Sequence, residues 1–94
     1  MTIKLKVGKL YRFISFSKPI KEWNAYSYNE KEDLFFDRVT LAYKNYFLLL
    51  KILDCGVSDR KVIKYFYENK IYWNTVNISD TSFDIEEYKN ANGC

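Results

Sequence analysis

Aromatic side chains are the residues of this chain best suited to form a binding site. The 94 residues include nine Tyr, seven Phe and two Trp, or 19% of the sequence. The core of so small a domain cannot hide them all. Exposed aromatic surface is typical of a protein-binding patch, although tyrosines can also rim a core with their hydroxyls in water. The candidates for a partner-binding surface are Trp23, Tyr26, Tyr28, Phe66 and Tyr72.

A group of cations forms a second candidate site. Arg60, Lys61 and Lys64 lie close together beside aromatic residues. Cations bind phosphates and aromatic rings stack on bases, so this combination is compatible with nucleic-acid binding. The formal net charge is only +3, and protein binding is therefore the preferred hypothesis.

The residue types that most catalytic sites need are missing or isolated. The sequence has no histidine, which removes the usual general base and the commonest metal ligand. Cys55 has no imidazole to activate it as a nucleophile. The three glycines, Gly8, Gly56 and Gly93, are too far apart to form a phosphate-binding loop. We therefore expect no enzymatic activity, no metal and no cofactor.

The cysteines and the N-terminal charges indicate the compartment. Cys55 and Cys94 are the only cysteines, and they suit either two free thiols in a reducing cytoplasm or a single disulfide. Lys4, Lys6 and Lys9 interrupt the first apolar residues, which argues against a signal peptide. No stretch is long enough to cross a bilayer. A cytoplasmic protein is expected.

Extended strands are the elements expected to position these residues. Ile3, Leu5 and Val7 alternate with lysines, which predicts a half-buried strand that bends at Gly8 and continues to Pro19. Residues 17–44 are polar with scattered aromatics, and we expect a long loop there. The apolar residues 45–53 predict a central strand, and residues 54–60 a second, shorter loop.

A hairpin is expected between residues 60 and 76. "RKVIKYFY" and "IYWNTV" are rich in β-branched and aromatic residues and are separated by "ENK". A three-residue loop over 68–70 with a positive φ at Asn69 or Lys70 would place Tyr65 opposite Trp73 on the inner face. Phe66 and Tyr72 would then belong to the exposed face.

The charge is distributed unevenly along the chain. Residues 1–21 contain six bases and no acid, whereas the segment "SFDIEEY" near the end is acidic. One interpretation is a basic arm for nucleic acid. The other is that the first and last strands pair and neutralise each other across a sheet. Because the bases alternate with apolar residues, we favour the second interpretation.

A helical interpretation competes with the strands. "ILDCGVSDRKVIKYF" is similar to a helix-turn-helix, with Gly56 in the turn, and it would give an α+β protein with a helix-turn-helix in residues 45–69. The second helix would be rich in Tyr, Phe, Ile and Val, which are mediocre helix formers. We therefore predict strands.

Taken in order, the expected strands resemble the plan of an SH3-like five-stranded barrel with a long first loop, as a single domain over residues 1–94. A single helical turn at "NISDT" would precede the last strand. "LKVGKLYRF", "FLLLKIL" and "KIYWNTV" are similar to segments of the small SH3-like barrel proteins of tailed, especially marine, bacteriophages. The acidic cluster and the proline of peptide-binding SH3 domains are absent from their usual places, so proline-rich ligands are not implied.

With catalysis set aside, the aromatic content favours a small non-enzymatic binding module that contacts a host or phage protein through loop aromatics. The resemblance adds the setting, a phage-encoded protein in the host cytoplasm, but little about mechanism. A nucleic-acid-binding protein or transcription regulator is one alternative. A minor structural protein of the virion is another. Partner identity and oligomeric state do not follow from the sequence.

Overall fold

The structure is a computed structural model. It describes residues 4–15, 18–29, 34–79 and 82–88, with backbone only at 28–29, 34–37 and 82. The described residues form nine strands. They are β1 (Leu10–Ser15), β2 (Lys18–Pro19), β3 (Glu22–Asn29), β4 (Leu34–Ala42), β5 (Phe47–Asp54), β6 (Arg60–Tyr67), β7 (Lys70–Ser79), β8 (Ser82–Phe83) and β9 (Ile85–Glu87).

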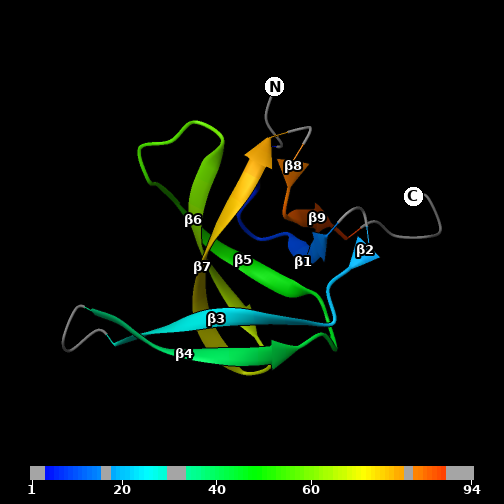
Figure 1. Ribbon diagram of the computed structural model, residues 1–94, viewed down its shortest axis with the longest axis vertical. Helices are drawn as coiled ribbons and strands as arrows, with labels where there is room; N and C mark the ends of the chain where they lie inside the picture. Colours follow the sequence, from blue (N-terminus) through cyan, green and yellow to red (C-terminus); the bar gives the residue numbers. More distant parts are fainter. Residues whose placement is uncertain (1–3, 16–17, 30–33, 80–81, 89–94) are drawn as a thin grey trace.

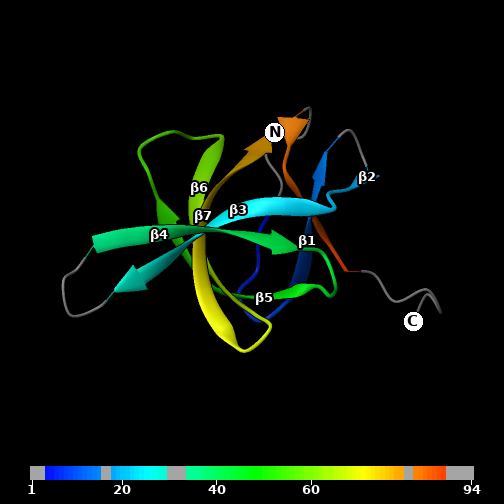
Figure 2. The ribbon, with the colours of Figure 1, turned by 60° about the horizontal axis from the view of Figure 1, so that its bottom comes forward.

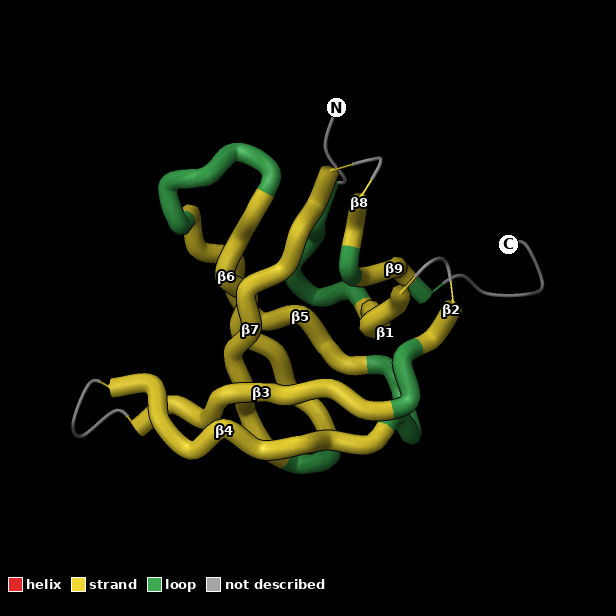
Figure 3. The backbone as a smooth tube through the Cα atoms, viewed as in Figure 1, coloured by secondary structure: helices red, strands yellow, loops and turns green. Residues whose placement is uncertain are grey.

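The strands form one antiparallel sheet that curls into a small, partly open barrel (Figures 1 and 2). Its order is β2-β1-β5-β6-β7-β3-β4, with β8 on β7 and β9 on β1. The predicted mainly-β barrel is confirmed, and its first strand pairs with its last as expected. The described residues contain no helix (Figure 3), so the helix-turn-helix in residues 45–69 is wrong. The described residues also contain no helix that is long and apolar enough to cross a membrane.

The hairpin of β6 and β7 is confirmed, but its register differs by one residue from the prediction. Glu68 and Asn69 have φ angles of 49° and 68°, which makes a two-residue turn with both central residues left-handed. Tyr65 therefore lies opposite Tyr72, and Lys64 lies opposite Trp73. A shift of one residue exchanges the two faces of a strand. Tyr72 consequently points into the core and Trp73 lies on the outer side of the sheet.

The two ends of the described chain meet as expected, although the strand starts later than predicted. Residues 4–9 are not a strand, and Val7 is exposed. The chain turns at Gly8, which has a φ of +90°, and β1 begins at Leu10. Arg12 then pairs with Glu86 of β9, with 2.7 Å between Nη2 and Oε2.

The segment "NISDT" also differs from its prediction. Its first three residues, 77–79, complete β7 rather than forming a helical turn. β7 then pairs with β8, with Ile78 opposite Phe83. The remaining two residues of the segment lie outside the described part of the structure.

The predicted long loop contains a β-hairpin. β3 and β4 pair from Glu22 opposite Ala42 to Asn29 opposite Leu34, and they lie across β7 at one end of the barrel (Figure 1). Successive side chains of β3 point to opposite faces of the sheet. Trp23 and Ala25 face the core and are buried, whereas Tyr26 points outward and is exposed.

Two tyrosine hydroxyls of β6 hold this hairpin to the barrel. Trp23 Nε1 donates a hydrogen bond of 3.0 Å to the Tyr65 hydroxyl, which in turn donates to Asn74 Oδ1. The Tyr67 hydroxyl donates to the backbone oxygen of Ala42. Buried polar groups need such partners, so these bonds fix where β3 and β4 cross the sheet.

The core of the described residues is largely aromatic. Phe47 is the centre of this packing, with its ring centroid 4.9 Å from that of Phe13 and 4.5 Å from that of Tyr65. Trp23 packs against Phe13 at 4.9 Å. Rings at these separations add to the stabilisation that burial of their area provides. The barrel thus absorbs much of the aromatic content that the sequence appeared to leave for its surface.

Candidate functional site: the outer face of the sheet

Two of the five predicted partner-binding residues belong to the core. Trp23 is 9% exposed and Tyr72 is 7% exposed, so neither can anchor a partner on the surface. The predicted loop over residues 17–44 includes Trp23, but the alternation of "EWNAYSY" is that of a strand and is the signal that identifies its buried position. Tyr72 was assigned to the wrong face because the predicted hairpin loop was one residue too long.

Two other candidates are exposed on the outer side of the sheet. Tyr26 of β3 and Phe66 of β6 each leave 40% of their surface in solvent. Both point away from the core, in contrast to their neighbours Ala25 and Tyr65. The side chain of Tyr28 lies outside the described part of the structure. The sheet therefore brings Tyr26 and Phe66 to one face, which we call the outer face.

An apolar row crosses the outer face over four strands. Cross-strand pairing joins Leu10 to Leu48, Leu48 to Phe66, and Phe66 to Ile71. Leu10 and Ile71 are 41% and 45% exposed, and Leu48 is half-buried. Directly paired residues share a face and contact one another. The apolar row therefore presents four hydrophobic side chains side by side rather than scattered singly.

A cation–aromatic row runs beside it over five strands. Pairing joins Lys51 to Lys64, Lys64 to Trp73, Trp73 to Tyr26, and Tyr26 to Arg38. Lys64 Nζ lies 5.6 Å from the centroid of the Trp73 ring, within the range of a cation–π contact. Two aromatic side chains thus lie between cations; Tyr26 is exposed, and Trp73, at 7% exposure, is buried beneath its neighbours.

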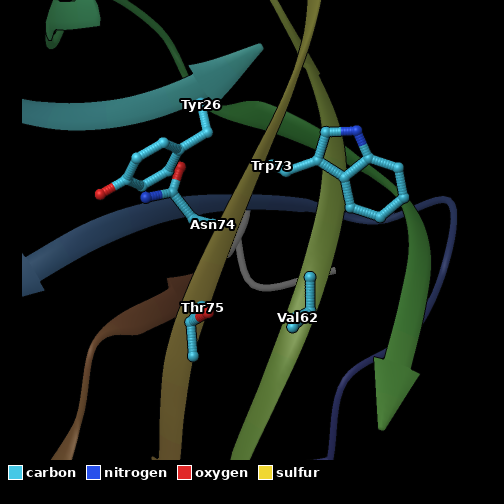
Figure 4. A pocket seen from close by; sticks show the side chains of 5 residues that line it. All are labelled: Tyr26, Val62, Trp73, Asn74 and Thr75. Carbon is cyan, nitrogen blue, oxygen red and sulfur yellow. The ribbon is translucent and has the colours of Figure 1, made fainter. Parts of the chain in front are cut away.

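A groove opens at the centre of this row. It has a volume of ≈ 330 Å³ and is lined by Tyr26, Val62, Trp73, Asn74 and Thr75. Figure 4 shows Tyr26 and Trp73 on either side of β7, with Thr75 and Val62 further along the strands. The Asn74 side chain of β7 donates a hydrogen bond of 2.8 Å to the backbone oxygen of Asn24. Asn24 and Tyr26 both belong to β3, so this bond helps to hold Tyr26 beside the groove.

The electrostatics of the cation–aromatic row are unbalanced. Lys51 and Lys64 lie directly opposite each other, and like charges in that position are destabilising. Among the described side chains, Lys51, Lys64 and Arg38 make no ion pair with an acid. An anion placed on this row would therefore meet three cations whose charge the described fold does not neutralise.

The predicted cation group does not form one patch. Arg60 and Lys64 share the outer face, whereas Lys61 points to the opposite side of β6, as alternation requires. Lys61 Nζ is 3.5 Å from Asp54 Oδ1. The Gly56 backbone N–H and then Lys61 lower the pKa of the Asp54 carboxyl. Arg60 Nε donates to Asn77 Oδ1 at 3.2 Å. Only Lys64 belongs to the cation–aromatic row.

Other chemistry has little support in the described residues. Within residues 4–15, 18–29, 34–79 and 82–88, no three Cys, Asp or Glu side chains gather as metal ligands would. Cys55 is a free thiol in an exposed loop; Cys94 lies outside the described residues. Comparison with known proteins provides no further guidance: no family model, no curated protein and no solved structure matches the chain.

Proposed function

We propose that this protein is a small, non-enzymatic binding module that contacts a protein partner through the outer face of its sheet. The observation that supports this most directly is the apolar row of Leu10, Leu48, Phe66 and Ile71. Contiguous exposed apolar surface of this kind marks protein–protein contact sites. Its aromatic member, Phe66, lies near the middle of the row, where interface energy usually concentrates.

The proposed setting follows the sequence resemblance. The protein would be encoded by a tailed phage and would contact a host or phage protein in the host cytoplasm, with a minor structural role in the virion as the alternative. In that alternative, the apolar row would bind a second copy of the chain. Sedimentation of the purified protein at several concentrations would separate the two, because in the absence of any other protein only self-contact makes the sedimenting mass rise with concentration.

The test is to remove the apolar row without damaging the fold. The double variant Phe66→Ser, Ile71→Ser should stay folded with a lowered melting temperature, because the two side chains lie outside the core but pair with each other across the strands. Val57→Ser is the matched control, since Val57 is 50% exposed but lies in the loop between β5 and β6.

The binding measurement uses a photo-crosslinking residue at position 48, between Leu10 and Phe66 in the row. Crosslinked products from host lysate are compared by mass spectrometry in the wild-type, double-variant and Val57→Ser backgrounds. The proposal expects a protein, or a second copy of the chain, that the double variant loses and the control retains. Equal crosslinking in all three backgrounds would refute it.

A further inference from the structure

We infer that the partner segment is an extended acidic peptide with an apolar residue midway between two acids, and that it lies across the strands on the cation–aromatic row. This rests on the proposed function and names the chemistry of the partner. The row places cations at both ends, with Lys51 and Lys64 on one side and Arg38 on the other. The groove lies between them.

The spacing of the strands sets the spacing of the acids. From Lys64 to Arg38 the row passes over β7 and β3, which is three strand-to-strand steps of about 4.8 Å, or roughly 14 Å in all. An extended peptide advances about 3.3 Å per residue, so four residues cover about 13 Å. The two acids should therefore be four positions apart.

The same geometry assigns the middle residue. In an extended peptide, side chains at positions i, i+2 and i+4 point to one side. When the acids at i and i+4 meet Lys64 and Arg38, the side chain at i+2 reaches the point between Trp73 and Tyr26. The groove there is lined by two aromatic rings, Val62, Thr75 and the amide of Asn74. That amide already bonds Tyr65 and the backbone of Asn24, so an apolar residue fits the groove.

The lysine pair explains why an acid is preferred at the first position. Lys51 and Lys64 repel each other in the free protein because they lie directly opposite. One carboxylate placed between them would add two attractions that outweigh that repulsion. An apolar or basic residue at this position would leave the repulsion in place, and this difference provides specificity.

The experiment uses an array of synthetic seven-residue peptides. Each has a central leucine, phenylalanine or tryptophan and two glutamates that are two, four or six positions apart, and a matching set carries lysine in place of glutamate. The best binder is then labelled with fluorescein and titrated by fluorescence anisotropy. The expected result is strongest binding at a separation of four, and no binding by the lysine set. Equal binding at all separations would overturn the inference.

Charge-reversing variants identify the surface. Lys64→Glu and Arg38→Glu should each weaken the best peptide roughly tenfold, since attraction becomes repulsion at a half-exposed site. Lys18→Glu, which makes the same charge change on β2, should weaken it less than about twofold. Equal weakening by all three variants would mean that net charge alone binds the peptide, and this would overturn the inference.

A twelve-nucleotide thymidine oligonucleotide is titrated in parallel. If it binds more tightly than every peptide and its affinity falls steeply with salt, the row is a nucleic-acid surface and the peptide inference is wrong. The two proposals can fail separately. Loss of the crosslinked partner in the Phe66→Ser, Ile71→Ser variant but not in Lys64→Glu would support the proposed function and refute this inference.

Discussion

Two cation–aromatic contacts in this protein have similar geometry and opposite surroundings. Lys64 lies 5.6 Å from the centroid of the Trp73 ring, and the guanidinium carbon of Arg12 lies 5.3 Å from that of Tyr46. Arg12 also bonds Glu86 of the neighbouring strand, at 2.8 Å from Nε, whereas Lys64 faces a second lysine.

The contact between Arg12 and Tyr46 lies in a closed region, in which the surrounding side chains of the fold provide partners for both the charge and the ring. Tyr46 packs edge-to-face against Tyr43 and Tyr88, with ring centroids 6.1 Å and 4.7 Å away. The hydrogen bond to Glu86 raises the pKa of the Arg12 guanidinium above its ordinary value. Both the charge and the rings therefore have partners within the described fold, which is what a structural contact requires.

The neighbourhood of Lys64 is open. Its charge has no acidic partner among the described residues, and none of their side chains fills the groove beside Trp73. A cation over an aromatic ring therefore does not by itself mark a binding site. What distinguishes the two regions is whether an acid among the described residues completes the contact.

The largest predicted effect is a loss of stability that disturbs the open region around Lys64 and Trp73 and leaves the closed region around Arg12 unchanged. Tyr65→Phe removes the hydroxyl that accepts from Trp23 and donates to Asn74. It should lower the free energy of unfolding by about 1–3 kcal/mol, because a buried donor loses its partner. The freed β3 should also let Tyr26 move away from Trp73.

Urea denaturation measures the stability change, and amide chemical shifts measure where it acts. Shifts are expected at Tyr26 and Trp73 and not at Arg12 or Glu86. Tyr88→Phe is the matched control, because it removes a hydroxyl from an exposed tyrosine. Uniform shifts across both regions would show that Tyr65 does not hold the outer face specifically.

Alkaline pH should weaken the hydrogen bonds that the Tyr65 hydroxyl makes with Trp23 and Asn74. Burial raises the pKa of Tyr65 above its ordinary value of 10.0, so the folded state keeps the proton that the unfolded state releases. The protonated Tyr65 hydroxyl therefore contributes to the free energy of unfolding in full below pH 10. This contribution is lost as pH rises from there toward the folded pKa, at about 1.4 kcal/mol per pH unit for one proton.

The measurement is the free energy of unfolding at pH 9, 10 and 11. Burial also raises the pKa values of Tyr11 and Tyr72, so the wild-type slope includes their contributions. Tyr65→Phe should reduce that slope without abolishing it. An unchanged slope in the variant would mean that Tyr65 is not a source of the alkaline sensitivity.

Removing the acid from the closed region should have a smaller effect. Glu86→Gln breaks the ion pair with Arg12, whose two side chains are 25% and 39% exposed. The free energy of unfolding should fall by about 0.5–1 kcal/mol, and the loss should shrink in 1 M salt. Glu87→Gln, the adjacent exposed acid, is the control and should change little. Equal losses in both variants would show that net charge, not the pair, is responsible.

The sequence specified the barrel better than it specified the site. The strands over residues 47–54, 60–67 and 85–87 follow from apolar content and alternation, and the pairing of the first strand with the last follows from the charge distribution. Local pattern is sufficient for these, because each strand carries its own signal.

The candidate site depends on features that local pattern does not fix. One residue in the turn at Glu68 and Asn69 decides whether Trp73 or Tyr72 faces outward. The cation–aromatic row needs Lys51, Trp73 and Arg38 from three separate strands. Their meeting depends on the crossing of β3 over β7, which no short stretch of sequence indicates.

The smallest predicted effect converts the open region into a copy of the closed one. Lys51→Glu places an acid directly opposite Lys64, as Glu86 lies opposite Arg12. Replacing repulsion by attraction across the strands should raise the free energy of unfolding by about 0.2–0.5 kcal/mol. Lys51→Gln, which removes only the repulsion, should give a smaller gain.

Stability and binding should therefore move in opposite directions at position 51. Differential scanning calorimetry measures the gain, and titration with the best acidic peptide measures the loss, because the new glutamate competes with the peptide for Lys64. A stabilised variant that binds the peptide as well as the wild type does would mean that Lys64 contributes to the fold alone. A stabilised variant that loses the peptide would instead show that Lys64 is held open for binding at a cost in stability.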